Sequence, residues 1–187
     1  MARRLIPAAE HPLAAAIVAD WLVTEWAHLY PDWDRRAAVD ELTATGQQRH
    51  PPCTWLLTED EADTDEEGDE ADDEGTDERA ITVLGSVGLS LGGELESPTD
   101  LTGPTPTGVW VVNLFVAPEA RGHGYGTMLL DHAIDHAAAL GIDTLLLTTE
   151  HSARHYRSRG WQDIGQTTLN GHPSTVMRLT LGRPVAP

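Results

Sequence analysis

One stretch of the sequence constrains the fold more than any other, because an apolar run, a glycine-rich turn and an amphipathic segment follow one another directly. The run 109–116 is apolar except for Asn113, which predicts a strand buried in a sheet. The apolar periodicity of 127–140 predicts a helix, and Gly141 stands where helices commonly end. A buried strand that leads into a helix is typical of an α/β domain.

Three alternate glycines, Gly122, Gly124 and Gly126, lie between that strand and that helix. Because glycine has no Cβ atom, a ligand can approach the backbone amides, and the positive end of the helix dipole favours an anion. The segment lacks the lysine of a Walker motif and has only part of a dinucleotide fingerprint. We interpret it as a phosphate cradle, with a glycine-rich turn that binds nothing as the alternative.

The rest of the chain supplies helices and strands around this centre. Helical periodicity predicts a first helix at 13–29 and a shorter second helix that Gly46 ends, with Asp32 or Asp34 available to cap its start. The other expected elements are strands at 53–58, 81–91, 143–149, 163–169 and 174–181 and a short helix at 152–158. This order predicts a single α/β domain, residues 1–187, with a mixed central sheet flanked by helices.

Acidic residues are concentrated in one segment. The chain has 30 acidic and 12 basic side chains, and 14 of the acidic ones lie between Glu59 and Glu78, which leaves 16 acids against 12 bases elsewhere. The segment lies between two expected strands and has no apolar residue larger than alanine. We therefore expect an acidic, disordered hairpin-loop insertion at 59–79. Its charge suits solubility, and the recruitment of basic substrates is the alternative.

Composition excludes several classes of chemistry. All twelve cationic side chains are arginine, so no lysine can form a Schiff base. The lone cysteine, Cys53, excludes an intrachain disulfide and a multi-thiolate zinc site, and its apolar neighbours predict that it is buried. The acidic balance speaks against nucleic-acid binding, and no apolar run is long enough for a membrane span. We expect a cytoplasmic protein.

Two histidine pairs have the spacing that can place two imidazoles on one metal ion, namely His132 with His136 and His151 with His155. No glutamate follows His132 as in the zinc-protease motif, and the first pair shares its part of the helix with acidic residues. We interpret that pair as part of a solvated polar face. The sequence therefore predicts no metal site.

Two motifs follow one another in the second half of the chain. Leu114-Phe115-Val116-Ala117-Pro118 with Arg121-Gly122-His123-Gly124-Tyr125-Gly126 resembles the coenzyme A motif of the GNAT N-acetyltransferase superfamily. His155-Tyr156-Arg157-Ser158-Arg159-Gly160-Trp161 resembles the tyrosine helix of the same family. The resemblance implies a GNAT-like domain in which a splayed strand pair holds coenzyme A.

The resemblance also implies roles for particular residues. The backbone of Leu114, Phe115 and Val116 would bind the pantetheine arm of acetyl-CoA, the co-substrate. The pyrophosphate would lie against the segment Arg121, Gly122, His123, Gly124, Tyr125, Gly126 and Thr127. Tyr156 matches the position of the general acid that protonates the departing thiolate, and an ordinary phenol pKa near 10 suits that task.

The general base and the acceptor are less defined. The central strand offers only Asn113 where many members of the family carry a carboxylate, which leaves Glu150, His151 or a water chain as candidates for the base. Glu25, Trp26 and Trp33 are expected to border the acceptor pocket. The expected activity is acetyl transfer from acetyl-CoA to a primary amine of a small molecule or a peptide. The alternative is a noncatalytic acyl-CoA sensor or interaction module, and a homodimer is compatible with the resemblance.

Overall fold

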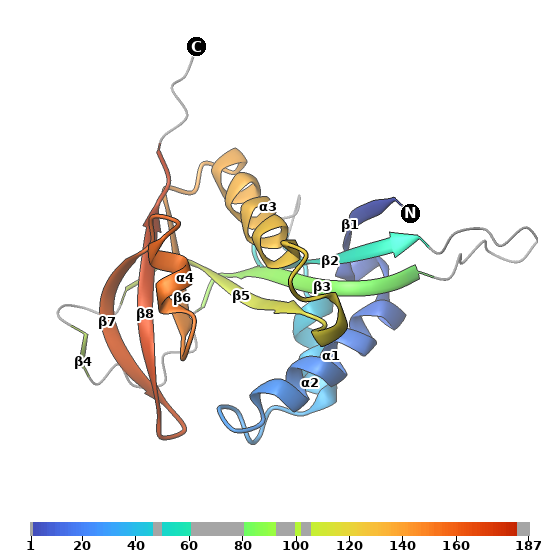
Figure 1. Ribbon diagram of the computed structural model, residues 1–187, viewed down its shortest axis with the longest axis horizontal. Coiled ribbons are helices and arrows are strands. Elements are labelled where there is room, and N and C mark those ends of the chain that lie inside the picture. The colour runs from blue at the N-terminus through green and yellow to red at the C-terminus, as the bar shows by residue number, and fades with distance from the viewer. Residues whose placement is uncertain (1, 47–49, 61–80, 93–99, 102–105, 183–187) are drawn as a thin grey trace, which may run out of the picture.

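The computed structural model describes residues 2–46, 50–60, 81–92, 100–101 and 106–182. These residues form one sheet of eight strands with helices on both faces (Figure 1). The strands are β1 (Arg3–Pro7), β2 (Cys53–Asp60), β3 (Ile81–Ser90), β4 (Asp100–Leu101), β5 (Val109–Val116), β6 (Thr144–Thr149), β7 (Gln162–Leu169) and β8 (His172–Thr180). The α-helices are α1 (Pro12–Trp26), α2 (Arg35–Thr43), α3 (Tyr125–Ala139) and α4 (Ala153–Arg157), and two short 3₁₀ turns are Ala8–Glu10 and Pro118–Ala120.

The sheet splays in its middle. Its strand order is β1-β2-β3-β5-β6-β8-β7-β4, and within the described residues β5 and β6 form the parallel pair. That pairing consists of Val109 with Leu145 and Trp110 with Leu146, after which the two strands diverge (Figure 1). The expected mixed sheet with a splayed strand pair is confirmed, and the divergence opens a gap at the carboxyl ends of both strands.

Each face of the sheet has its own apolar core. Helix α3 covers one face, where Leu129 and Leu130 are fully buried together with Met177 of β8. Helices α1 and α2 cover the other face, where Leu22 and Leu42 are fully buried. Complete burial of a leucine side chain contributes about 1.5–3 kcal/mol, so these two layers hold the central strands in place.

A bulge interrupts β5 at Asn113. Asn113 has a φ of +54°, and the pairing register between β3 and β5 shifts between Ser86 and Gly88. The Ser86 hydroxyl donates a 2.7 Å hydrogen bond to the Asn113 carbonyl, and the Asn113 side-chain amide donates one of 2.7 Å to Glu41. On β3, a Cβ atom at Gly85 would collide with the carbonyl oxygen of Phe115, so the strands approach closely because this residue is glycine.

The N-terminal strand β1 was not expected from the sequence. It pairs with β2, where Arg3 forms a 3.2 Å ion pair with Glu59 and Arg4 one of 2.9 Å with Asp60. The predicted acidic insertion therefore begins too early, because its first two acids belong to β2. Strands β2 and β3 pair to their ends, Asp60 opposite Ile81, and the rest of the predicted insertion lies outside the described residues.

Most predicted boundaries differ from the observed ones by a few residues. Strand β5 has the predicted bounds, whereas α1 ends at Trp26, three residues before the predicted end. Asp34 caps α2 by accepting a 2.8 Å hydrogen bond from the amide of Ala37. The short strand β4 was also not expected.

The interpretation of His132 and His136 as a solvated polar face is wrong. Both rings lie edge-on to Trp55 of β2, with ring centroids 4.8 and 4.6 Å away. Nε2 of His132 is buried without a hydrogen-bond partner among the described residues, and burial lowers the pKa of this imidazole. Cys53 is buried, as predicted.

No helix within the described residues is long and apolar enough to cross a membrane.

Candidate functional site

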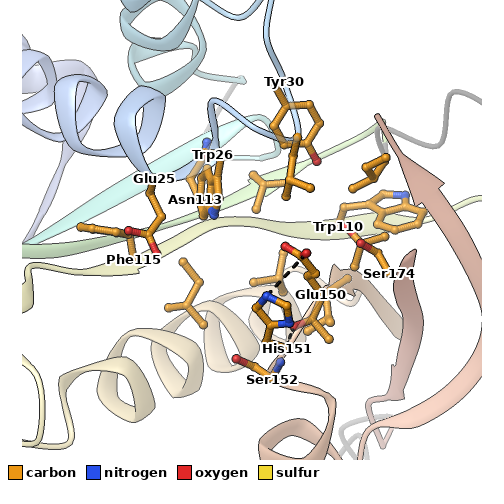
Figure 2. Close-up of a pocket in the computed structure, with 18 of the residues that line it drawn as sticks. Glu25, Trp26, Tyr30, Trp110, Asn113, Phe115, Glu150, His151, Ser152 and Ser174 are labelled. Atoms are coloured by element: carbon orange, nitrogen blue, oxygen red, sulfur yellow. Dashed lines mark hydrogen bonds and ion pairs between the residues drawn. The ribbon is translucent and has the colours of Figure 1, made fainter. Parts of the chain in front are cut away.

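A cleft of about 660 Å³ lies where β5 and β6 diverge (Figure 2). Its volume is within the range of about 300–1,000 Å³ that is usual for small-molecule sites. The cleft brings together ten of the residues selected from the sequence: Glu25, Trp26, Trp33, Leu114, Phe115, Val116, Arg121, Glu150, His151 and Tyr156. The remaining predicted site residues, 122–127, are not among those that line it.

Aromatic rings from α1 and the following loop form one wall of the cleft. Trp26 stacks on Trp33 with ring centroids 6.3 Å apart, and it meets the Phe115 ring edge-on at 6.4 Å. Tyr30 contacts Trp33 edge-on at 6.3 Å. Flat rings supported by other rings form a rigid apolar surface, which suits the less polar face of an acceptor molecule.

Glu25 and Arg121 lie together at one end of this wall. Their charged groups are 3.8 Å apart, and each side chain is about half exposed. Arg121 lies over the Phe115 ring at 5.4 Å, and its Nε donates a 3.1 Å hydrogen bond to the carbonyl of Val116. The negative charge of Glu25 is therefore partly balanced by Arg121. The two residues mark the border between the cleft and the glycine-rich turn.

The glycine-rich turn is open above its backbone. Gly122 and Gly124 have φ values of +83° and +81°, and a Cβ atom added at either would meet nothing within 4 Å. Gly124 is the N-cap of α3 and supplies no capping side chain, so the first-turn amides of α3 lack a side-chain cap. An uncapped helix start beside open space has the geometry of an anion site.

Three side chains of this turn contact other groups of the chain. Nδ1 of His123 lies 3.0 Å from the Arg121 carbonyl, and the buried Tyr125 ring lies 5.1 Å below the Arg3 guanidinium. The Thr127 hydroxyl accepts a 3.3 Å hydrogen bond from Arg159. Arg159 also forms a 2.8 Å ion pair with Asp131, so the backbone amides are the part of the cradle that is open to an anion.

Tyr156 reaches the cleft from α4 and is 9% exposed. Its ring packs against Trp161 with centroids 5.8 Å apart. Burial raises the pKa of the phenol to about 12, above the value near 10 expected from the sequence. The phenol therefore keeps its proton at neutral pH and can act there as an acid but not as a base.

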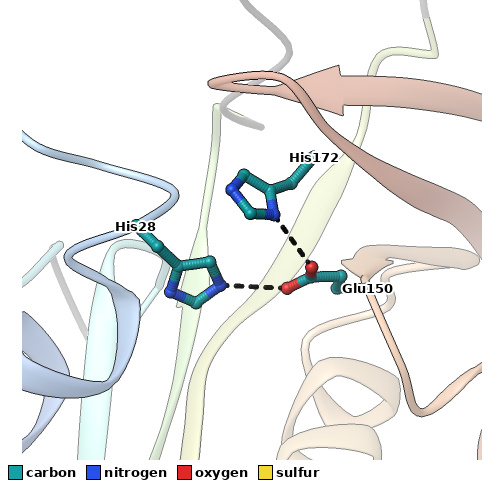
Figure 3. A group of neighbouring side chains, drawn as sticks. All are labelled: His28, Glu150 and His172. Atoms are coloured by element: carbon teal, nitrogen blue, oxygen red, sulfur yellow. Dashed lines mark hydrogen bonds and ion pairs between the residues drawn. The ribbon is translucent and has the colours of Figure 1, made fainter.

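Glu150 stands directly after β6 and is contacted by imidazoles from two other elements (Figure 3). Its Oε2 lies 3.0 Å from Nε2 of His28, and its Oε1 lies 3.2 Å from Nδ1 of His172. His151, whose side chain is 83% exposed, lies 3.5 Å from Oε1. The hydrogen bond with His28 contributes most to lowering the pKa of Glu150, so its carboxylate is ionised at neutral pH.

Sequence reasoning missed His28 and His172, because neither belongs to a motif. His28 follows α1, and His172 begins β8 directly after the turn Asn170-Gly171. The Asn170 side-chain amide donates a 2.7 Å hydrogen bond to the His28 carbonyl, which holds the two segments together. Only the turn signal at Asn170-Gly171 was visible in the sequence, and it does not reveal what the hairpin end contacts.

Ser174 adds a polar group to the floor of the cleft, beside Trp110 (Figure 2). Its side-chain oxygen is buried and has no hydrogen-bond partner among the residues that the structure describes. The hydroxyl of Thr167, which pairs with Ser174 from β7, is also buried without a hydrogen-bond partner among the described residues. An unsatisfied buried hydroxyl costs about 1–3 kcal/mol, so a ligand that bonds to Ser174 would gain from it.

Comparisons with known proteins agree on one family. Residues 18–161 match the model of the Acetyltransferase (GNAT) family. No curated protein matches the chain in sequence.

Several solved structures share the fold. One is aminoglycoside 6′-acetyltransferase type Ii, with a TM-score of 0.60 and 19% identity over 98% of this chain and 100% of that chain. An aminoglycoside 6′-N-acetyltransferase complexed with coenzyme A gives 0.61 and 16% over 98% and 99%. The acetyltransferase yncA of Salmonella typhimurium, with its cofactor acetyl-CoA, gives 0.59 and 17% over 100% and 98%. At these identities the likeness shows the fold alone.

Proposed function

The chain belongs to the GNAT acetyltransferase family, and from this premise we propose that it transfers an acetyl group from acetyl-CoA to a primary amine. One observation carries the proposal. The cleft between β5 and β6 has a side-chain-free anion cradle at its border and a buried phenol and an ionised carboxylate on its walls.

The residues present fit acetyl-CoA as co-substrate. A pyrophosphate needs amide donors and room to approach them, and the uncapped start of α3 beside Gly122 and Gly124 offers both. The edge of β5 at Leu114 and Phe115 borders the cleft where β6 has diverged, so its backbone is available to an extended chain. Coenzyme A-bound structures among those of the same fold support this choice of co-substrate.

Acetyl-CoA supplies an activated thioester, and the task of the protein is to position the amine and manage two protons. Tyr156 supplies the first proton. Its side chain lines the cleft and, like any phenol, it is protonated at neutral pH, so it can donate to the sulfur as negative charge develops there. Burial raises its pKa to about 12, which makes it a weaker acid than a free phenol. The ring contact with Trp161 holds the phenol in position.

Glu150 handles the second proton. It borders the cleft with a side chain 16% exposed, and it is ionised, so it attracts an incoming ammonium group. Because its pKa is lowered, the carboxylate is a weak base that passes the proton of the amine on to water, since the imidazole nitrogens of His28 and His172 that face it already donate hydrogen bonds to it. His151 contacts Glu150 at 3.5 Å from an exposed position and is the second candidate of the two named from the sequence.

The walls of the cleft favour an acceptor with a positive and an apolar part. Glu25 and Glu150 lie on opposite sides of it, and the Trp26 ring lies on the α1 side (Figure 2). The Trp33 ring stacks on Trp26. Ser174 offers a hydroxyl to a polar group of the acceptor. We propose a small molecule or peptide that carries a primary amine next to a ring or an aliphatic group.

The proposal is tested in two steps. Acetyl-CoA and coenzyme A at millimolar concentration are expected to raise the melting temperature, since each binds the folded state. A panel of amines is then incubated with acetyl-CoA, and acetylated product is detected by mass spectrometry. No stabilisation by either nucleotide contradicts the proposal, and stabilisation without any product favours the noncatalytic acyl-CoA sensor instead.

A further inference from the structure

Three donor groups of a kind that transition metals prefer come together beside the cleft. The loop after α1 supplies His28, the end of β6 supplies Glu150, and the β7–β8 hairpin supplies His172 (Figure 3). Each offers one ligand atom, and these three atoms lie within 4.8 Å of one another. Two imidazoles and one carboxylate are a donor set found in zinc and non-haem iron sites. We propose that His28, Glu150 and His172 bind a divalent transition metal ion of the zinc class.

The distances to the carboxylate are already close to those of a coordination sphere. Two ligand atoms on one zinc ion, each about 2.1 Å from it in a tetrahedron, are about 3.4 Å apart. Nε2 of His28 lies 3.0 Å from Oε2 of Glu150, and Nδ1 of His172 lies 3.2 Å from Oε1, so each imidazole contacts a different carboxylate oxygen. An ion between them requires the two imidazole nitrogens to approach each other, and both side chains have room to rotate because they are 44% and 42% exposed.

The segments that carry the donors are held together by other contacts. The Asn170 side chain bonds to the His28 carbonyl at 2.7 Å, and the rings of His28 and His172 meet edge-on with centroids 4.9 Å apart. Three residues from distant parts of the chain are therefore brought together before any ion binds, which lowers the entropy cost of binding.

Three protein ligands leave coordination positions free. In structural zinc sites four protein ligands close the coordination sphere, whereas three leave a position for water or a ligand. Glu150 and His28 line the cleft, so that position is accessible from it.

In the absence of metal the same contacts are hydrogen bonds, and an ion must displace the protons on the two nitrogens. Metal binding and these hydrogen bonds to Glu150 therefore exclude each other. If the proposed acetyl transfer uses Glu150, a bound ion inhibits it. Metal binding itself does not depend on the proposed function.

Calorimetric titration of tag-free protein with Zn²⁺, after treatment with EDTA and without any acetyl-CoA or amine, tests the site directly. We expect one ion per chain with a dissociation constant below about 10 µM. Glu150→Gln and His172→Gln are each expected to weaken binding at least about tenfold, as the loss of a ligand does. The matched control is His50→Gln, which changes an exposed histidine outside the cluster and should bind as the wild type does.

Absence of saturable one-to-one binding in the wild type, or equal binding by the Glu150 and His172 variants, overturns the proposal. The absorption spectrum of the Co²⁺-loaded wild type is a second measurement that needs no variant. Visible d–d bands that are shifted and more intense than those of Co²⁺ in buffer support coordination by the protein, and a spectrum identical to that of Co²⁺ in buffer also overturns the site. Because no acetyl transfer enters either readout, failure of this proposal is distinct from failure of the proposed function.

Discussion

The side-chain amide of Asn113 donates a 2.7 Å hydrogen bond to the carboxylate of Glu41 and thereby joins the bulge of β5 to helix α2. The bulge turns the end of β5 away from regular pairing at the point where the strand borders the cleft. Asparagine suits this position for two reasons. It tolerates a positive φ, and its short side chain reaches Glu41.

Replacing Asn113 should therefore destabilise the protein. We expect Asn113→Ala to lower the free energy of unfolding by about 1–3 kcal/mol, because it removes a hydrogen bond to a charged group and places a Cβ-bearing residue at positive φ without compensation. Asn113→Gly removes the same bond without the backbone strain and should lose about 1 kcal/mol less. Urea denaturation of both variants measures the difference, and equal losses would contradict the role of the backbone conformation.

The cradle is tested by comparing two glycines with the same backbone conformation. Gly124→Ala should cost about 1–2 kcal/mol of stability and weaken acetyl-CoA binding at least about tenfold, because the methyl group lies where a phosphate approaches. Gly141 at the other end of α3 has a φ of +74° and equally open surroundings. Gly141→Ala should show the same loss of stability and unchanged binding. Equal binding by both variants would argue against the cradle.

Tyr156→Phe separates the chemical step from binding. The variant keeps the ring that packs on Trp161 but has no proton to donate, so we expect kcat to fall about 100-fold while the affinity for acetyl-CoA is unchanged. Calorimetry gives the affinity and a thiol-release assay gives kcat. Full turnover by this variant would exclude Tyr156 as the acid.

Glu150 and His151 are adjacent in the chain, and their variants distinguish the two candidates for the base. Glu150→Gln should lower kcat at pH 7 by about 100-fold, because the amide can neither attract the ammonium nor accept a proton from the amine. His151→Ala should change kcat by less than about threefold, since that side chain is 83% exposed. The reverse order of effects would assign the role to His151.

Cys53 should make the protein sensitive to alkali. Burial raises the pKa of its thiol to about 11, whereas an unfolded chain loses that proton near pH 9. Above about pH 9 deprotonation favours the unfolded chain, so stability falls as the pH rises toward 11. Cys53→Ala lacks this contribution, and its unfolding free energy should decline less steeply between pH 9 and pH 10. If the unfolding free energies of the wild type and of Cys53→Ala decline with the same slope over this pH range, the raised pKa of Cys53 is contradicted.

The parts of the fold that were predictable have strong local signals. The apolar run of β5 and the helix end at Gly141 are specified by neighbouring residues, and each is found where the pattern places it. Strand β1 has no such signal. It depends on pairing with β2 and on the ion pairs of Arg3 and Arg4 with acids more than fifty residues away in the sequence.

The residues of the candidate site also divide into those that belong to a local sequence motif and those that only the fold brings together. The residues of the cradle, the edge of β5 and Tyr156 belong to contiguous motifs, so the sequence alone was enough to propose them. His28 is 122 residues from Glu150 and His172 is 22, so no spacing rule connects the three. Periodicity also placed His132 and His136 on one face of α3, but it could not show that β2 would bring Trp55 against them.

Because β2 and β3 are paired up to their ends, the chain should tolerate a change of length in the segment that connects them. Asp60 and Ile81 face each other across the ladder, and such partners have Cα atoms about 5 Å apart. A two-residue turn spans that separation as well as a long segment does. Residues 61–80 are therefore a natural point for exchange, where a compact turn or an inserted reporter domain would leave the course of the flanking strands unchanged.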